Sequence, residues 1–359
     1  MRRDRLVRAL RGEETDTIPI WLMRQAGRHL PGYRKLRETH PLLEIALTPE
    51  LAAEVTLEPV RRYDVDAGIV FADISLPFLG LGVPFSIDPG LGPVVAHPIR
   101  SREDVEALTE FDARASVPFV GKTIERFLEL EAERPIVGFA GGPFTLAAYL
   151  VEGGPARECV ETKRLIYSDP RTFDRLIARL AAMTVDYLRL QAESGAAALQ
   201  VFDTWVGAVT PSVFERHLLE PVRTIFQELR ILRRPLIYFS TGSSHLLELL
   251  ARTGADALGV DWREPLGRVR GRIGEGMTLQ GNLDPGALLG TSETLRREAR
   301  RVLDEVPGGR PHVFNLGHGV LPATDPDRVR ELVEYVHDAG RGQRKRRSRS
   351  RPGKPPPRS

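Results

Sequence analysis

Two arginines that directly follow an apolar run are the residues best suited to chemistry in this sequence. The run from Ile18 to Met23 has the length of a buried strand, and Arg24 and Arg28 come after it with Gly27 between them. The two arginines are four residues apart, so a helical turn would place both on one face. Arginine binds carboxylates through paired hydrogen bonds. The loop therefore predicts either an ordinary solvated surface or a site for an anionic, carboxylate-bearing ligand.

Other polar residues follow further apolar runs or lie about one turn beyond them. They are Asp73, Tyr149, Asp203, Thr204, Ser240, Asp261, Asn282 and His318. Taken singly, the aspartates and Ser240 predict helix caps and Tyr149 predicts a core residue, whereas His318 between two glycines has little packing reason to be there. In a parallel barrel the carboxyl ends of the strands meet at one face. The shared position of these residues therefore favours a single functional site.

The elements that would position these residues alternate between strand and helix. Apolar runs of strand length occur at 18–23, 67–71, 136–140, 198–202, 236–239, 257–260, 277–283 and 312–316. Helix-like segments separate most of them, at 162–193, 211–232, 243–253, 264–273 and 285–305. This alternation is typical of an α/β protein with parallel strands, and eight strands favour a single (β/α)8 TIM-type barrel over an open doubly wound sheet. Residues 80–99, rich in Gly and Pro, predict a hairpin excursion instead.

The composition indicates a globular protein with a sizeable core. Of the 359 residues, 42% are hydrophobic and 28% are charged. No apolar run approaches the roughly 18 residues of a membrane span, and no apolar segment of a secretory signal follows the basic N-terminus. The single cysteine, Cys159, excludes an internal disulfide and a multi-thiolate zinc site. We therefore expect a cytoplasmic protein without membrane contact.

Residues 341–359 form a separate segment at the C-terminus. They hold nine Lys or Arg and no acid, which leaves 42 basic and 48 acidic residues in the remainder of the chain. With almost no apolar residue, the segment cannot bury enough surface to fold alone. We therefore expect one domain, 1–340, whose last helix spans 328–339, and a disordered Arg/Ser/Pro-rich tail, 341–359. We expect the tail to be dispensable for catalysis and to bind polyanions weakly.

Motifs for cofactors and metals are absent from the sequence. The Gly141-Gly142 pair could cradle an anion, yet no Lys-Ser/Thr pair follows as it would in a P-loop. Neither Gly-x-Gly-x-x-Gly nor His-Glu-x-x-His occurs. We therefore expect the protein to use neither a metal nor an organic cofactor.

Three stretches together resemble a known family. The segment Met23-Arg24-Gln25-Ala26-Gly27-Arg28, preceded by Pro19-Ile20-Trp21, is similar to the N-terminal signature of bacterial-type uroporphyrinogen decarboxylases. Residues 138–153 resemble the family's second signature and residues 314–320 its histidine-bearing last loop, and the likeness extends from about Arg5 to Ala339. The resemblance implies a (β/α)8 barrel. It also implies a homodimeric carboxy-lyase that converts the four acetates of uroporphyrinogen III to methyls, giving coproporphyrinogen III in haem and chlorophyll biosynthesis.

The resemblance also implies which residues act. The residues implied to be catalytic are Asp73, Arg24, Arg28, Tyr149 and His318. The residues implied to bind substrate are Arg24, Gln25, Arg28, Asp73, Tyr149, Thr204 and His318. Thr204 departs from the animal-type pattern, which has a serine, but keeps the hydroxyl. Asp73 would face the pyrrole N–H groups and the arginines would hold carboxylates, while the choice of proton donor stays open between His318, Tyr149 and the arginines.

Two other function classes remain as alternatives. Corrinoid-linked methyltransferases share the barrel ancestry but hold zinc through thiolate and imidazole ligands, and Cys159 lies in an expected loop far from any strand end. A nucleic-acid-binding protein is the third interpretation, and it rests only on the basic tail. A metal assay distinguishes the methyltransferase interpretation from the decarboxylase.

Overall fold

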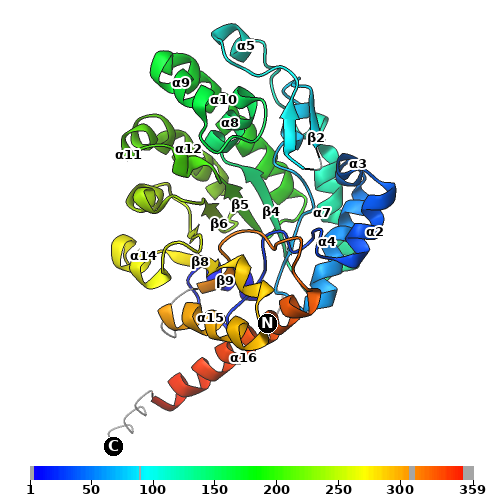
Figure 1. Ribbon diagram of the computed structural model, residues 1–359, viewed down its shortest axis with the longest axis vertical. Coiled ribbons are helices and arrows are strands. Elements are labelled where there is room, and N and C mark those ends of the chain that lie inside the picture. The colour runs from blue at the N-terminus through cyan, green and yellow to red at the C-terminus, as the bar shows by residue number, and fades with distance from the viewer. Residues whose placement is uncertain (1–3, 89, 307–311, 351–359) are drawn as a thin grey trace, which may run out of the picture.

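Seven parallel strands form the centre of the molecule. The computed structural model describes residues 4–88, 90–306 and 312–350, and Figure 1 shows the strands surrounded by helices. The sheet has the order β1-β4-β5-β6-β7-β8-β9, and every neighbouring pair is parallel. The strands are β1 (Gly68–Ile69), β4 (Ile136–Gly141), β5 (Ala198–Phe202), β6 (Leu236–Phe239), β7 (Ala257–Gly259), β8 (Thr278–Leu283) and β9 (His312–Leu316). The expected parallel α/β architecture is confirmed.

The segment after Pro19 closes the barrel between the two edge strands. Ile20 makes an isolated parallel bridge with Phe314 of β9, and the Phe314 amide donates to the Pro19 carbonyl at 2.8 Å. On the other side, the amide of Asp66, just before β1, donates to the Ile20 carbonyl at 2.8 Å. Pro19 has no N–H to give to a ladder, and the Ile20 N–H goes to the Asp66 carboxylate. The expected strand at 18–23 is therefore present as a single bridge.

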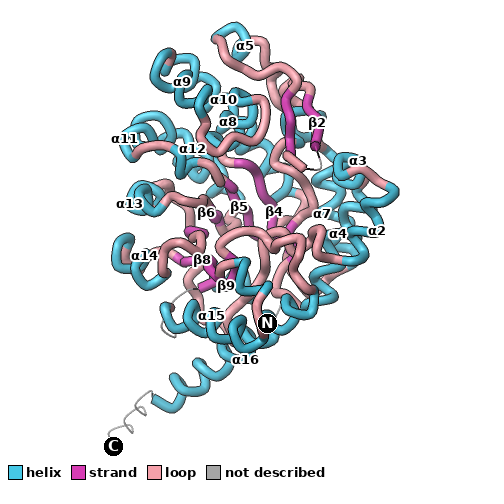
Figure 2. Tube along the Cα trace, in the orientation of Figure 1, coloured by secondary structure: helices cyan, strands magenta, loops and turns pink. Residues whose placement is uncertain are grey.

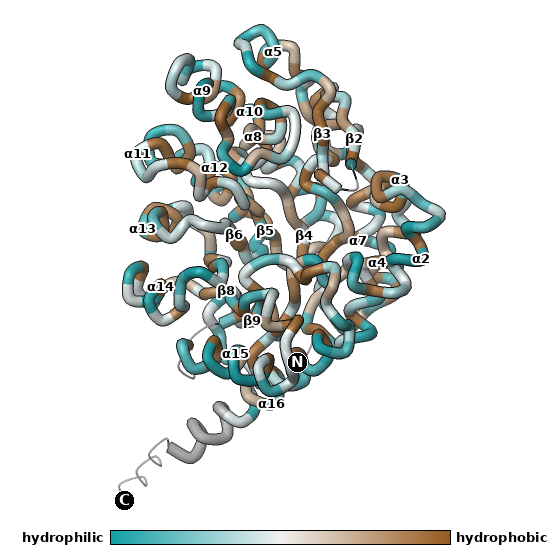
Figure 3. The backbone as a smooth tube through the Cα atoms, viewed as in Figure 1, coloured by the Kyte–Doolittle hydropathy of each residue, from teal (hydrophilic) through white to brown (hydrophobic). Residues whose placement is uncertain are grey.

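An outer layer of helices covers the barrel, as the cyan segments of Figure 2 show. The helices of the barrel layer are α1 (Arg5–Leu10), α2 (Pro31–Thr39), α3 (Leu42–Leu47), α4 (Pro49–Tyr63), α7 (Pro118–Leu130), α8 (Pro143–Glu152), α9 (Val160–Ser168), α10 (Pro170–Glu193), α12 (Leu219–Leu229), α13 (Leu247–Leu250), α14 (Leu266–Ile273), α15 (Ser292–Glu305) and α16 (Pro326–Ser350). Several begin at a proline, which suits the first helical position because its N–H is not needed there. In Figure 3 the strands are mostly apolar, whereas the helices alternate between polar and apolar residues.

A hairpin projects from the barrel where the glycine-rich excursion was expected. Strands β2 (Phe85–Asp88) and β3 (Gly92–Val95) pair antiparallel, which confirms the prediction. The Val95 amide donates to the Gly153 carbonyl at 2.9 Å, so the hairpin is fixed to the end of α8. Two short helices, α5 (Arg102–Glu106) and α6 (Ala113–Ser116), follow it.

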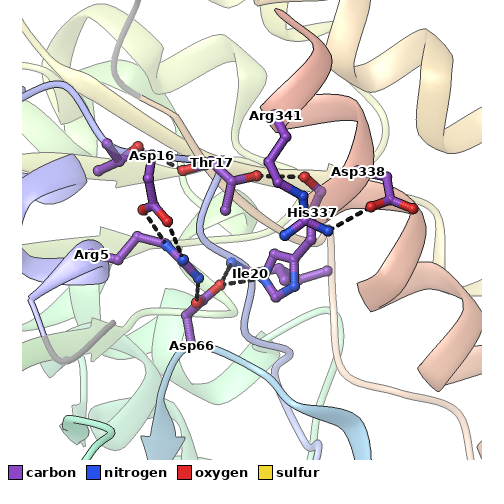
Figure 4. A network of polar contacts seen from close by, with 9 residues as sticks. Arg5, Asp16, Thr17, Ile20, Asp66, His337, Asp338 and Arg341 are labelled. Atoms are coloured by element: carbon purple, nitrogen blue, oxygen red, sulfur yellow. Dashed lines mark hydrogen bonds and ion pairs between the residues drawn. The ribbon is translucent and has the colours of Figure 1, made fainter. Parts of the chain in front are cut away.

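A buried polar network fastens the amino end of the barrel (Figure 4). Arg5 pairs with Asp66 and with Asp16, the latter at 2.5 Å. The second oxygen of Asp66 accepts from the Ile20 amide and contacts Nε2 of His337 in α16, both at 2.8 Å. This network ties α1, the closing segment, β1 and α16 together, and so fixes the direction in which the chain leaves Ile20 toward Arg24.

The last helix is longer than the sequence pattern predicts. We expected it to span 328–339, whereas α16 runs from Pro326 to Ser350. The first ten residues of the basic segment therefore continue the helix, and Arg341 pairs with Asp338 at 2.5 Å. Residues 351–359 of the expected tail lie outside the described residues. Within the described ranges, none of the helices combines the length and apolar character needed to cross a bilayer.

Candidate active site

The loop that carries the two arginines is held by Gln25. The segment is not helical, so the expected helical turn is absent, and Arg24 adopts a left-handed conformation with φ of 58°. The Gln25 side chain is 0% exposed; its oxygen accepts from the Leu22 amide at 2.9 Å and its nitrogen donates to the Ala67 carbonyl at 3.0 Å. Gln25 thus fixes the turn that presents Arg24, and its own amide is already occupied on both sides.

The arginine loop and the last loop of the barrel are in direct contact. The Val320 amide donates to the Met23 carbonyl at 2.9 Å. A β-carbon added at Gly319 would collide with the aliphatic part of Arg24, so only glycine lets that side chain pass. Arg24 and Arg28 are both exposed, and neither guanidinium makes an ion pair within the part of the chain that the structure describes.

Asp73 follows β1 and presents one free carboxylate oxygen. Its Oδ1 accepts from the Ser75 amide at 2.9 Å and from the Ser75 hydroxyl at 2.6 Å. Its Oδ2 has no hydrogen-bond partner among the described residues, and the side chain is half-buried. One oxygen therefore closes the turn at Ser75, which is itself the N-cap of the short helix η1 (Leu76–Leu79), and the other is available to a ligand.

Tyr149 lies on α8 and its ring is half-buried. The pKa of its phenol is raised to about 12, chiefly by burial and also by the Asp73 carboxylate, while Arg24 opposes the rise. The carboxylate of Asp73 and the guanidinium of Arg24 therefore lie near enough to this phenol to act on its pKa. The ring stacks on Trp205 with centroids 4.3 Å apart, and the adjacent Thr204 is half-buried. Within the described chain, the Thr204 hydroxyl has no hydrogen-bond partner.

His318 lies in the last loop, next to Gly319, whose backbone packs against the Arg24 side chain. Its pKa is lowered to about 4, chiefly by burial and also by the charges of Arg24 and Arg263, while Asp261 opposes the fall. The imidazole is therefore neutral at pH 7. Its ring meets the ring of Trp262 edge to face, with centroids 6.3 Å apart.

Asp203, which follows β5 directly whereas Asp73 comes four residues after β1, is a structural residue. It is 0% exposed, and its Oδ1 accepts from the amide and the hydroxyl of Thr145 at 2.8 and 2.7 Å. Its Oδ2 accepts from the Tyr238 hydroxyl at 2.9 Å. A β-carbon at Gly142 would collide with this carboxylate. The anion cradle suspected at Gly141-Gly142 is thus filled by Asp203, which caps α8.

Sequence reasoning missed Trp262 and Arg263, which follow Asp261 at the end of β7. The guanidinium of Arg263 lies over the Trp262 ring at 4.0 Å from its centroid and pairs with Asp261 at 2.5 Å. The signal was present, because both residues directly follow a strand-end aspartate. Asn282 and Ser240 are used internally: the Asn282 amide donates to the carbonyls of Asp261 and Glu264, and the Ser240 hydroxyl bonds Ser243.

Cys159 lies apart from this site. It is buried, its thiol bonds the Ala156 carbonyl at 3.2 Å, and burial raises its pKa to about 11. Among the described residues, no three His, Cys, Asp or Glu side chains gather as metal ligands would.

Two comparisons of the sequence with known proteins indicate one family. Residues 1–339 match the model of the family described as uroporphyrinogen decarboxylase (URO-D). The chain is 47% identical to a uroporphyrinogen decarboxylase of Streptomyces avermitilis over 331 residues, covering 92% of this chain and 93% of that protein. It is 46% identical to one of Thermus thermophilus over 335 residues, covering 93% and 98%. A solved methyltransferase from Methanosarcina mazei superposes with a TM-score of 0.77 at 19% identity, covering 94% and 98%, which shows the shared fold alone. The chain belongs to the uroporphyrinogen decarboxylase family and is a carboxy-lyase of tetrapyrrole biosynthesis.

Proposed function

We propose that the chain removes the four acetate carboxyl groups of uroporphyrinogen III at the site formed by Arg24, Asp73, Tyr149 and His318. The observation that carries this proposal is the free Oδ2 of Asp73, whose charge acts on the Tyr149 phenol together with the charge of Arg24. A carboxylate beside cationic and neutral donors suits a substrate that carries both carboxylates and pyrrole N–H groups.

The pyrrole ring supplies the electron sink for this reaction. A proton added to the ring carbon next to the acetate-bearing carbon makes the ring cationic. When the bond to the carboxylate breaks, its electron pair enters the ring and carbon dioxide departs. A proton then adds to the former acetate carbon to give a methyl, and the first proton leaves the ring. Each acetate thus takes up one net proton, and the scheme needs no separate electron sink.

Asp73 has the central role in this scheme. Its Oδ1 is fixed by two hydrogen bonds from Ser75, so the direction of Oδ2 is set before substrate arrives. Oδ2 accepts hydrogen bonds from the pyrrole N–H groups, and the attraction grows as the ring becomes cationic. An interaction that strengthens in the transition state accelerates the chemical step.

The remaining residues bind and orient substrate. Arg24 and Arg28 hold carboxylates, and Gln25 positions the first of them by anchoring the loop. Tyr149, with its raised pKa, and His318, with its lowered pKa, are both neutral at pH 7. They therefore act as neutral hydrogen-bond donors, and Thr204 offers a further hydroxyl.

The proposed function extends to the oligomeric state and the location of the enzyme. The enzyme works in the cytoplasm as a homodimer, and the exposed Leu91 at the tip of the β2–β3 hairpin supports that hairpin as a contact surface. Light scattering at micromolar concentration tests the dimer, and a clean monomer contradicts it.

The basic residues of 341–359 bind polyanions weakly. Heparin should retain the full chain at low salt and release it near physiological salt.

The test of the proposed function is product analysis. The protein is incubated with uroporphyrinogen III under reducing conditions, and the products are separated by carboxyl count after dialysis against a strong chelator. We expect coproporphyrinogen III at an unchanged rate. Unreacted octacarboxylate, or turnover that returns only with added zinc or another cofactor, contradicts the proposal.

A further inference from the structure

We propose that Arg263 is an additional substrate-binding residue, which holds a carboxylate of the tetrapyrrole at the loop after β7. This inference rests on the proposed function, because it names a further contact to the same substrate. It is independent of the arginine loop, because Arg263 comes from a different strand end and lies outside the stretches on which the family resemblance rests.

Arg263 is held in one orientation by two neighbours. Its Nη1 donates to Oδ2 of Asp261 at 2.5 Å, and its backbone amide donates to Oδ1 at 3.0 Å. The guanidinium plane lies over Trp262 at 4.0 Å, which adds a cation–π contact. Asp261 is itself fixed, since its Oδ2 also accepts from the Gly242 amide at 2.5 Å. A long side chain on the surface of a loop is thus prevented from moving freely.

This guanidinium lies at the described site. A β-carbon at Gly317 would collide with the backbone of Trp262, so the loop after β7 touches the loop that carries His318. The Trp262 ring meets the His318 ring, and both Arg24 and Arg263 act electrostatically on the imidazole. Two guanidinium groups from different loops, those of Arg24 and Arg263, therefore lie near His318.

Arg263 keeps donors for a ligand. Its side chain is 52% exposed, whereas that of Asp261 is only 7% exposed. The carboxylate of Asp261 accepts a hydrogen bond from Nη1 of Arg263. The Nε and Nη2 atoms of Arg263 have no hydrogen-bond partner among the described residues. Because Asp261 offsets part of the positive charge, we expect Arg263 to contribute less than an unpaired arginine would. Its fixed plane still favours a paired contact to a carboxylate.

The test measures KM and kcat for Arg263→Gln and Arg263→Lys. If the contact is made equally in the ground and transition states, the glutamine variant raises KM by roughly tenfold and leaves kcat within about twofold. The lysine variant should fall between it and the wild type, because it keeps the charge but loses the planar fork. Arg252→Gln is the matched control: Arg252 is 56% exposed, pairs with Glu215 at 3.1 Å, and follows α13 at the other end of the barrel.

Binding of two oxidised porphyrins then identifies the carboxylate. Uroporphyrin carries acetates and propionates, whereas coproporphyrin keeps only the propionates. If Arg263→Gln weakens the binding of both porphyrins by the same factor, Arg263 holds a propionate. If it weakens the binding of uroporphyrin alone, Arg263 holds an acetate. A wild-type KM and wild-type affinity for both porphyrins in Arg263→Gln overturn this inference while the wild-type enzyme still turns over. Absence of turnover in the wild type overturns the proposed function instead.

Discussion

The two ends of the barrel use the same residue types in opposite ways. At the amino end, the side chains of Arg5, Asp66 and His337 are buried. They bond to one another or to the backbone, so protein groups already satisfy their charges and donors. At the carboxyl end, Arg24 and the Oδ2 of Asp73 have no such partner among the described residues. The difference separates polar groups that hold the fold from groups kept ready for a ligand.

The same distinction separates two aspartates that the sequence makes look alike. Asp73 and Asp203 each follow a buried strand, but Asp203 has both oxygens occupied and Asp73 has one free. Strand-end position is therefore not enough to identify a reactive carboxylate. The decisive property is whether the protein's own donors satisfy it.

The substitution with the largest expected effect on stability lies at the amino end of the barrel. Asp66→Asn removes the charge that pairs with Arg5 and contacts His337, and leaves a buried guanidinium with only Asp16. We expect a loss of roughly 3 kcal/mol in the free energy of unfolding. Urea denaturation measures it. kcat of the folded fraction should stay unchanged, and a large fall in kcat at full folding would break the distinction between the two ends.

The next effect is expected at Tyr149. Tyr149→Phe keeps the stack on Trp205 and removes the hydroxyl that the Asp73 charge acts on. We expect kcat/KM to fall about tenfold, the usual scale for one hydrogen bond to a charged group. Steady-state kinetics at low substrate measures it. Tyr63→Phe, which removes a buried hydroxyl at the end of α4 on which the Asp73 charge does not act, is the control. If kcat/KM is unchanged in Tyr149→Phe, the Tyr149 phenol belongs to the core and has no role in the reaction.

His318 should couple the site to acid stability. Burial lowers its pKa from 6.5 to about 4 in the folded protein, so the unfolded chain takes up the proton first as pH falls. The folded state therefore loses stability as pH drops from 6.5 toward 4, and gains nothing above that window. We expect His318→Gln to reduce the acid-induced fall in melting temperature by roughly 2 °C and to change nothing near pH 8. Calorimetry across this range measures the difference, and equal acid sensitivity of both proteins would contradict the assignment.

The smallest effect is expected at the C-terminus. A chain ending at Gly340 removes the distal part of α16 but keeps His337 and its contact with Asp66. We expect unchanged melting temperature and unchanged turnover, together with loss of heparin binding. If truncation cripples turnover, the segment 341–359 contributes to the active site and the domain boundary at 340 is wrong.

Much of this architecture could be predicted because the strands are continuous apolar runs. All eight expected runs lie where the structure has β1, β4 to β9 or the Ile20 bridge. The weak eighth strand could not be foreseen, because the Ile20 amide bonds a side chain more than 40 positions away, that of Asp66. The end of α16 was misjudged, because a polar, basic segment carries little apolar periodicity to follow.

The candidate site was predicted less completely than the fold. Residue types and strand-end positions indicated Arg24, Asp73 and His318, but not which side chains are already occupied. The internal use of Gln25, and the stacking of Arg263 on Trp262, depend on contacts between distant segments. Sequence spacing within one loop does not encode such contacts.

The most direct test of the central claim is the rate of the first decarboxylation in Asp73→Asn, measured in a single turnover with saturating enzyme. The substitution removes the charge that faces the developing cation and hardly changes the volume. We expect the rate to fall at least about a hundredfold, while melting temperature and uroporphyrin affinity stay close to the wild type. A wild-type rate in Asp73→Asn would contradict the account, and Asp73 would then be a cap of the Ser75 turn only.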